Sequence, residues 1–329
     1  LEFRRVLFRS DEAASARHMK GLLDALTKLG AQFSDMPNPG HLPFTISGQL
    51  NASEQLQQLQ IDASASSQYV SALLLISPAL PFELQIEVDS VLPSIRHVEM
   101  TVAEVNACGG QIENLGGETG DWNTRQIRHL WRCRPARLRG GERHIEPDLT
   151  NAGPFLAAAM ICGGQVSIPH WPAKTFQAGD AWRQLLTPMG ARIYRSPEGS
   201  LVCQGSGVIG GTQCDLEAVG ELTPTLAALC TLAVEPSKLT GIGHLRGHET
   251  DRLNALETEI KRLGGKAQAS ETTLRISPAP LHGDLVQTYG DHRMAMFAAL
   301  IGLQIPGVQI ADIECVSKTF PDFTATWEA

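Results

Sequence analysis

Apolar residues recur with a helical period in four segments of the chain, and each segment closes on a glycine before a short β-prone stretch. The closing glycines follow one another at spacings of 79, 81 and 74 residues. A nearly fixed spacing indicates an internal repeat. The segments are GLLDALTKLGAQF (21–33), MTVAEVNACGGQI (100–112), AWRQLLTPMGARI (181–193) and RLNALETEIKRLGGKA (252–267), and they close at Gly30, Gly109, Gly190 and Gly264.

A second kind of helical segment alternates with the first. It is rich in small residues and follows a polar, often acidic start, as in 66–76, 151–161, 222–234 and 291–303. Short β-prone stretches lie between and after the helices, at 165–169, 201–204, 273–278 and 307–313. Two helices and several strands per repeat predict an α/β protein of stacked layers.

The order of the helix types predicts where the repeat begins. The first helix after Asp11 is of the glycine-closed kind and the last long helix is of the small-residue kind, so the chain starts within a unit and we expect a natural parent to extend further toward the N-terminus. Residues 1–10 fit neither a helix nor a strand period and lack the apolar core of a signal peptide. We interpret them as a non-native segment, with a native basic arm as the alternative.

A polar, Arg-rich stretch at 121–144 separates two pairs of units. Polar stretches with few apolar residues are typical of domain boundaries. We therefore predict an N-terminal domain over 11–145 and a C-terminal domain over 146–329.

Composition narrows the choice of partners and compartment. The chain carries 27 Lys and Arg against 35 Asp and Glu, and this net charge of −8 gives no global positive field for a nucleic acid. Its apolar runs are far shorter than the about 20 residues that cross a bilayer. Seven cysteines without a CxxC pair favour reduced packing thiols over disulfides or zinc. We expect a cytoplasmic protein that binds neither nucleic acid nor membrane.

Arginines stand at helix starts, where the free N–H groups ordinarily favour anions. Arg17 precedes one predicted helix, Arg252 opens another, and Arg293 follows the predicted N-cap Asp291. A cation at such an end is expected when it and the helix start face the same anionic ligand. A surface arginine paired with a nearby acid explains any single case, whereas three cases together favour anion binding.

Hydroxyl and amide side chains gather before another helix. Asp62-Ala-Ser-Ala-Ser-Ser-Gln68 places Ser66, Ser67 and Gln68 at the free N–H groups of a first turn, which predicts a cradle for an anion. Ser94 stands in the same way before the next helix. An ordinary N-cap cluster is the alternative for both places.

The segment 244–252 is the densest cluster of ionisable residues in the sequence. His244 and His248 are four residues apart, but Gly247 argues against the continuous helix that a His-x-x-x-His zinc pair needs. Metal binding stays an alternative there. We interpret Glu249, together with Glu221, as a carboxylate available for proton transfer.

Five segments together resemble those of the 5-enolpyruvylshikimate-3-phosphate synthase family, also called 3-phosphoshikimate 1-carboxyvinyltransferases. They are DASASSQYVSALLL, PDLTNAGPFLAAA, GHLRGHETDRL, GDHRMAMFAALIG and CVSKTFPDF, and they occur in the family's order from about Arg17 to the C-terminus. The resemblance implies a two-domain enolpyruvyl transferase fold, an inside-out α/β barrel of six βαβαββ units. It also implies substrates bound between the domains, a monomer, and a family that is the target of glyphosate.

In this family phosphoenolpyruvate donates its carboxyvinyl group to the 5-hydroxyl of shikimate 3-phosphate and releases phosphate, without metal or cofactor. The resemblance places Glu221 and Glu249 at the two catalytic carboxylates. It assigns the remaining residues to substrates: Ser66, Ser67, Gln68, Ser94, Glu221 and His248 to shikimate 3-phosphate, and Arg17, Gln68, Arg252, Arg293 and Lys318 to phosphoenolpyruvate.

The sequence departs from the family in two ways. His248 stands where many members have Lys, which suggests the branch from high-GC Gram-positive bacteria and a contact that weakens as the imidazole loses its proton. The family's first phosphate-binding segment is absent, so we expect no measurable carboxyvinyl transfer from this exact chain. Two alternatives stay open: an inactive fragment of the same fold, and the sister transferase that acts on UDP-N-acetylglucosamine.

Overall fold

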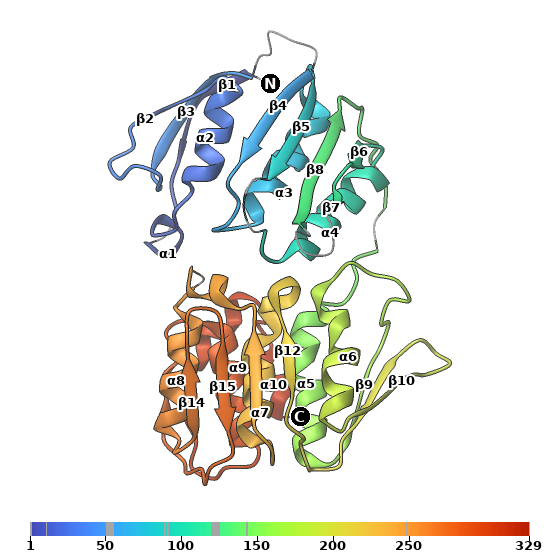
Figure 1. The fold of residues 1–329 in the computed structure, drawn as a ribbon, viewed down its shortest axis with the longest axis vertical. Helices are drawn as coiled ribbons and strands as arrows, with labels where there is room; N and C mark the ends of the chain where they lie inside the picture. The colour runs from blue at the N-terminus through green and yellow to red at the C-terminus, as the bar shows by residue number, and fades with distance from the viewer. Residues whose placement is uncertain are drawn as a thin grey trace. The chain divides into compact units, whose positions relative to one another are not determined.

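The computed structural model describes residues 2–10, 12–50, 56–88, 90, 92–119, 126–142, 144–247 and 249–328. The chain divides into two compact units, Leu1–Arg143 (unit 1) and His144–Ala329 (unit 2). Each unit combines helices with small β-sheets, which is the α/β class predicted from the sequence (Figure 1). Within the described ranges, no helix is both long and apolar enough to cross a membrane.

The described residues of unit 1 form two sheets. One has the order β1-β3-β2 and is antiparallel throughout; the other has the order β4-β5-β8-β6, with β7 paired to β8. The elements are β1 Glu2–Phe8, α1 Glu12–Ser15, α2 Lys20–Lys28, β2 Ala31–Ser34, β3 Phe44–Gln49, β4 Leu56–Ile61, α3 Gln68–Ile76, the 3-10 helix η1 Ser77–Ala79, β5 Glu83–Val88, α4 Ile95–Ala107, β6 Gln111–Asn114, β7 Gly117–Thr119 and β8 Gln126–Arg134.

Residues 2–8 form a strand although their sequence fits no strand period: Glu2–Phe8 is β1 and pairs with β3. An antiparallel ladder is held by backbone groups and needs no particular sequence. Side chains add to the ladder where Phe8 meets Phe44, with ring centroids 5.7 Å apart. The non-native origin of the segment stays a prediction.

The stretch 121–144 is only partly a connection between domains. Its described part from Gln126 to Arg134 is strand β8, which pairs with β5 and with β6 inside unit 1. Arginines on β8 pair with acids on those neighbours, Arg128 with Glu87 and Arg134 with Glu113. The polar composition therefore reflects cross-strand ion pairs on an exposed face.

In the part of unit 2 that the structure describes there are three sheets, with the orders β10-β11-β9, β12-β13-β15-β14 and β16-β17. The elements are α5 Leu149–Cys162, β9 Gln165–Ile168, η2 Ala178–Ala181, α6 Trp182–Leu186, η3 Thr187–Met189, β10 Arg192–Arg195, β11 Leu201–Gln204, β12 Gln213–Asp215, η4 Glu217–Leu222, α7 Thr223–Leu232, β13 Ser237–Thr240, η5 Gly243–Gly247, α8 Arg252–Arg262, β14 Lys266–Ala269, β15 Leu274–Ser277, β16 Leu285–Val286, α9 His292–Gly302, β17 Gln309–Ile310, η6 Ile313–Lys318 and α10 Phe323–Glu328.

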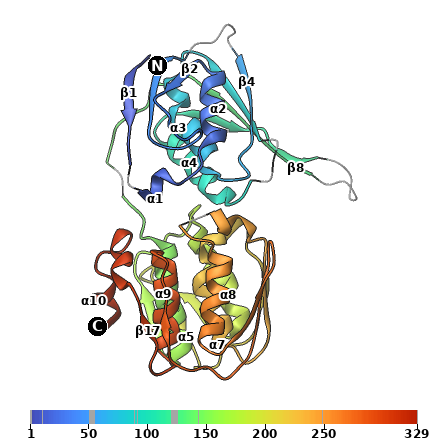
Figure 2. The same cartoon turned by 90° about the vertical axis from the view of Figure 1, so that its left-hand side faces the viewer.

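Three helices rich in small residues, α5, α7 and α9, lie at the centre of unit 2 and pack against one another (Figure 2). Nearly every residue of α7, from Thr223 to Thr231, is buried. A helix that is apolar on all sides is stable only when neighbours cover all of it. The core of unit 2 is therefore helical, with the sheets outside it.

The repeat predicted from the sequence is visible in the structure. All four closing glycines have positive φ, between 85° and 106°, a conformation that other residues rarely adopt. Two sheets also repeat one topology, since β4-β5-β8-β6 follows the same chain order as β12-β13-β15-β14.

Two predicted elements are shorter than expected. The segment 181–193 forms only α6 and then a 3-10 turn, because Pro188 lacks the N–H that a continuing α-helix needs. The stretch 307–313 contains a strand of two residues, Gln309–Ile310, before η6 begins.

Candidate active site

Parallel strand pairs determine where the candidate residues of unit 2 lie. Strand β12 runs parallel to β13, and β16 runs parallel to β17. The carboxyl ends of parallel neighbours lie at the same edge of a sheet, where ligands bind in α/β proteins. Glu221 follows β12, Glu249 and Arg252 follow β13, Arg293 follows β16, and Lys318 follows β17.

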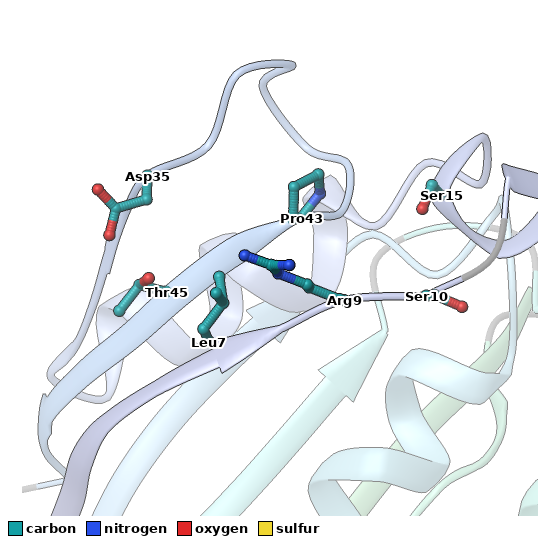
Figure 3. Close-up of a pocket in the computed structure, with 7 residues that line it drawn as sticks. All are labelled: Leu7, Arg9, Ser10, Ser15, Asp35, Pro43 and Thr45. Atoms are coloured by element: carbon teal, nitrogen blue, oxygen red, sulfur yellow. The ribbon is translucent and has the colours of Figure 1, made fainter.

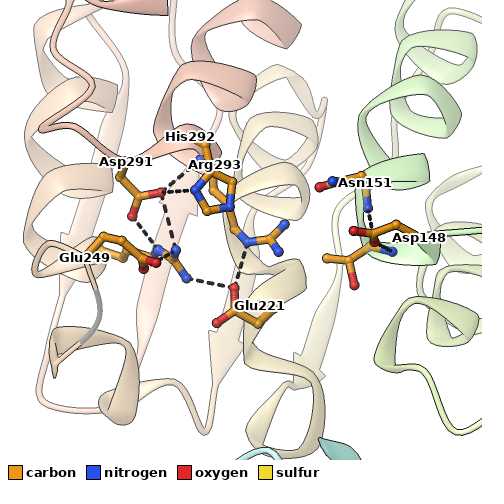
Figure 4. A network of polar contacts seen from close by, with 9 residues as sticks. Asp148, Asn151, Glu221, Glu249, Asp291, His292 and Arg293 are labelled. Atoms are coloured by element: carbon orange, nitrogen blue, oxygen red, sulfur yellow. Dashed lines mark hydrogen bonds and ion pairs between the residues drawn. The ribbon is translucent and has the colours of Figure 1, made fainter. Parts of the chain in front are cut away.

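The Arg252 side chain is the centre of a buried network of ion pairs. Figure 4 shows three members of this network, Glu221, Glu249 and Asp291. Its Nε donates to Asp291 Oδ2 at 2.7 Å and its Nη2 to Glu249 Oε2 at 2.8 Å, while its Nη1 donates to Glu221 Oε2 at 3.0 Å. The side chain is only 1% exposed. Burial lowers the pKa of Arg252, but Glu221, Asp291 and Glu249 outweigh it and raise the pKa above its ordinary value.

Glu221 is held by two cations on the same oxygen. Its Oε2 accepts from Arg293 Nε at 2.7 Å as well as from Arg252. Both guanidinium groups therefore bring positive charge against this one oxygen. The side chains of Glu221, Glu249 and Arg293 are 19%, 20% and 14% exposed, so all three reach the surface of the network.

The sequence did not show that Asp291 belongs to this network. Asp291 was predicted only as an N-cap, and its Oδ1 does accept from Arg293 N at 2.9 Å. It is also fully buried and binds Arg252 with its other oxygen. Three carboxylates against two guanidinium groups leave the network with one net negative charge.

His292 is a second residue that sequence reasoning missed. Its side chain is buried beside Asp291, with Nδ1 3.9 Å from Asp291 Oδ1. Burial lowers the pKa of His292, and the neighbouring Arg293 lowers it further, whereas Asp291 opposes the shift. We therefore expect a neutral imidazole at neutral pH. The sequence did not indicate this burial, because His292 stands between two charged residues, Asp291 and Arg293.

The segment that contains Lys318 is tied to the start of α5. Asn151 is buried, and its Nδ2 donates to Thr319 O at 3.5 Å. Asp148 caps α5 by accepting from the backbone N of Thr150 and of Asn151, both at 2.9 Å. Lys318 itself is the last residue of η6 and is exposed.

Unit 1 repeats the same arrangement with neutral side chains. Strands β4 and β5 are parallel, and α3 and α4 follow them. A hydrogen bond from Ala63 N to Ser90 Oγ, 3.0 Å long, joins the two connections. Ser66 Oγ accepts from Gln68 N at 3.2 Å, whereas Ser94 starts α4 with a φ of 52° and caps it with no side-chain bond.

Burial differs among the predicted residues of unit 1. Ser67 and Ser94 are buried, Ser66 is half-buried, and Gln68 is exposed as the first residue of α3. Arg17 is exposed and lies between α1 and α2, ahead of the helix that the sequence predicted after it. His248 lies outside the described residues.

Two other features of the structure bear on ligand binding, namely groups of metal-ligating side chains and a surface pocket. In the described part of the chain, no group of three or more His, Cys, Asp or Glu side chains is placed to hold a metal ion. An open pocket in unit 1 includes none of the predicted site residues; Figure 3 shows it, and it is lined by Leu7, Arg9, Ser10, Ser15, Asp35, Pro43 and Thr45.

Known proteins with similar sequences are carboxyvinyltransferases. The family described as EPSP synthase (3-phosphoshikimate 1-carboxyvinyltransferase) matches residues 2–327. A 3-phosphoshikimate 1-carboxyvinyltransferase from Bifidobacterium longum is 43% identical over 98% of this chain and 72% of its own length. The enzyme of that name from Kocuria rhizophila is 44% identical over 97% of this chain and 69% of its own length.

Solved structures show the same fold. An EPSP synthase from Acinetobacter baumannii superposes with a TM-score of 0.74 at 21% identity, over 98% of this chain and 72% of that one. A second structure of EPSP synthase from the same organism gives a TM-score of 0.73 at 20% identity. The family match, the two relatives and the fold agree, and the chain belongs to the EPSP synthase family.

Proposed function

We propose that the protein transfers the carboxyvinyl group of phosphoenolpyruvate to the 5-hydroxyl of shikimate 3-phosphate when the family's first phosphate-binding segment is present, with Glu221 and Glu249 as the carboxylates that move protons. One observation carries the assignment: Glu221 and Glu249 contact the same buried guanidinium, that of Arg252, and both remain partly exposed. Two carboxylates held by one rigid cation can act on neighbouring atoms of one substrate. The family match favours this activity over the sister reaction on UDP-N-acetylglucosamine.

The arginines supply charge for phosphoenolpyruvate, which carries a carboxylate and a phosphate. Arg293 bonds Glu221 through Nε and is 14% exposed, so its terminal nitrogens are well placed for an anion. Arg252 is saturated by carboxylates, and an incoming anion would exchange with one of them. We assign Arg17, Lys318 and the amide of Gln68 to the same substrate.

Shikimate 3-phosphate is assigned to neutral donors in unit 1. Ser66, Ser67 and Gln68 stand where α3 begins, and Ser94 stands where α4 begins. Backbone N–H groups and hydroxyls at a helix start can hold a phosphate without a bound metal. Glu221 and His248 complete the proposed contacts to this substrate.

The reaction needs two proton movements in each step. In the addition, the 5-hydroxyl oxygen bonds to C2 of phosphoenolpyruvate and loses its proton, while C3 gains one. In the elimination, C3 loses a proton, the bond from C2 to the phosphate oxygen breaks, and that oxygen takes up a proton as inorganic phosphate leaves. Glu221 is paired with two cations, and we assign it to accept the proton of the 5-hydroxyl. Glu249 is paired with Arg252, and we assign it to donate and accept the protons at C3.

A carboxylate beside C2 also stabilises the positive charge that develops there. The proposed mechanism uses no metal and no cofactor, because the charged side chains supply both the binding and the proton transfer.

We also propose that the protein acts in the cytoplasm and as a monomer. All seven cysteines lie among the described residues and are free thiols. Burial raises the pKa of Cys133 and of Cys203 to about 11, so these thiols pack as neutral groups. Sedimentation velocity tests the monomer, and thiol titration of protein from cells tests the reduced state.

Ligand binding tests the function directly. In isothermal titration calorimetry we expect the chain to bind shikimate 3-phosphate, and to bind phosphoenolpyruvate when shikimate 3-phosphate is present. Binding of neither ligand by folded protein would contradict the proposal. Phosphate release with both substrates then separates an active transferase from the inactive form of the fold.

A further inference from the structure

A buried carboxylate on α8 lies outside the proposed catalytic network. Glu259 is fully buried, and its carboxylate accepts hydrogen bonds from three residues. Arg262 Nε donates at 2.8 Å, the backbone N of Gln287 at 3.0 Å, and Tyr289 Oη at 2.7 Å. A buried charge is costly unless it is paired and hydrogen-bonded, and here two of the partners belong to one distant segment.

That segment is the turn that leads into α9. Asp291 N donates to Thr288 O at 2.9 Å, and the two central residues, Tyr289 and Gly290, have φ values of 56° and 67°. Two positive φ values define a type I′ turn, which favours Gly, Asn and Asp. Tyr289 is unfavourable there, so its backbone conformation depends on contacts from elsewhere.

The phenol of Tyr289 supplies such a contact. Its hydroxyl bonds Glu259, although the residue is 44% exposed. Burial of the hydroxyl raises the pKa of Tyr289 to about 12, and the bond to Glu259 adds to the shift. The phenol therefore remains a donor throughout the neutral range. Glu259 thus fixes both sides of Thr288, through the backbone of Gln287 and the side chain of Tyr289.

The turn ends in the proposed site. Asp291 follows Gly290 directly; its Oδ1 accepts from Arg293 N and its Oδ2 accepts from Arg252 Nε. Any shift of the turn moves the start of α9 and, with it, the guanidinium of Arg293.

We propose that Glu259 and Tyr289 are positioning residues, which hold the turn at 287–290 so that Arg293 is ready for phosphoenolpyruvate; this inference rests on the proposed function. The hydrogen bond of Tyr289 acts through Arg293 and touches no substrate. Its loss should therefore affect one ligand and not the other.

The test compares Tyr289→Phe with Tyr194→Phe. Tyr194 is a matched control in unit 2, because it is similarly exposed and its Oη accepts from Gln204 Nε2 at 3.5 Å. By calorimetry, Tyr289→Phe should weaken phosphoenolpyruvate binding about fivefold or more, and leave shikimate 3-phosphate within about twofold. Tyr194→Phe should change neither. Glu259→Gln keeps a side chain that can bond both Gln287 N and Tyr289 and should retain the affinity for phosphoenolpyruvate.

Hydrogen exchange gives a readout that needs no ligand. The backbone amides of Asp291 and Arg293 should exchange faster in Tyr289→Phe than in the parent or in the control. Unchanged exchange and unchanged phosphoenolpyruvate affinity would overturn the proposal, as would an equal loss for both ligands with a lowered melting temperature. If the parent binds no phosphoenolpyruvate, the proposed function fails, and the exchange rates still decide whether Tyr289 holds the turn.

Discussion

The two units present candidate residues in the same topological position but with opposite chemistry. In unit 2 the positions after parallel strands carry Glu221, Arg252 and Arg293, which are bonded to one another. In unit 1 the equivalent positions carry Ser66 and Ser94, which are neutral. The described bonds of these serines are short-range, such as that from Gln68 N to Ser66 Oγ.

The difference shows how each kind of group can be kept in place before a ligand arrives. A guanidinium that is 1% exposed needs carboxylates around it, so the charges of unit 2 fix one another. A serine hydroxyl costs less free energy to bury than a charged group does. Because the serine side chain is also short, the backbone alone can position it. We infer that unit 2 loses geometry when one member is removed, whereas unit 1 loses only the contact itself.

The largest expected effect follows from removing the buried carboxylate of Asp291. Asp291→Ala leaves Arg252 without one partner and α9 without its cap, which should lower the free energy of unfolding by about 3 kcal/mol. Glu113→Ala is the control in unit 1, because Glu113 pairs with Arg134 on an exposed strand and such pairs contribute little. Chemical denaturation measures both variants. If both variants lost a similar free energy of unfolding, a buried ion pair in unit 2 would contribute no more to stability than an exposed pair in unit 1.

In a chain completed with the family's first phosphate-binding segment, Glu221→Gln should act on turnover and leave binding largely intact. Gln retains an acceptor for Arg293 but cannot take a proton, so turnover should fall by roughly 10²-fold or more. Affinity for shikimate 3-phosphate should stay within about tenfold, since several groups share that ligand. A phosphate-release assay measures the turnover, and calorimetry measures the affinity for shikimate 3-phosphate. Near-parental turnover would remove Glu221 from the mechanism and leave it a purely structural member of the network.

Arg293→Ala should separate the two substrates. Loss of one charge-assisted contact should weaken phosphoenolpyruvate by about 1.5 to 3 kcal/mol, with a much smaller change for shikimate 3-phosphate. Arg192→Ala is a matched control, because Arg192 lies on β10 with its guanidinium 5.5 Å from the Tyr194 ring. Calorimetry measures the affinity for each ligand separately. An equal loss of affinity for both ligands would contradict the assignment of Arg293 to phosphoenolpyruvate.

Local signals in the sequence predicted much of the fold and part of the site. The positions of the helical segments, and the four glycines that close half of them, were predictable because periodicity and positive φ at glycine depend on neighbours in the chain. Glu221, Glu249, Arg252 and Arg293 were selected from their residue types and positions, the family resemblance added their roles, and the structure bonds all four into one network.

The partners of these residues could not be predicted. Arg252 and Asp291 are 39 positions apart, and Tyr289 is 30 positions from Glu259, so only tertiary packing brings each pair together. Strand β1 was missed for the same reason, because its ladder to β3 depends on an available sheet edge. Residues whose role is to hold other residues give the weakest sequence signals.

The smallest expected effect compares the starts of two helices, one in each unit. Asp148 caps α5 with two hydrogen bonds, whereas Ser67 occupies the N-cap of α3 without a side-chain bond to the helix. Asp148→Ala should therefore cost about 1 kcal/mol of stability. Ser67→Ala should cost clearly less, because no capping bond is lost and its proposed partner is the substrate. Native-state hydrogen exchange in α5 and α3 measures each loss separately. A loss in α3 as large as that in α5 would mean that Ser67 supports the helix, and its assignment to shikimate 3-phosphate would then need a contact other than the hydroxyl.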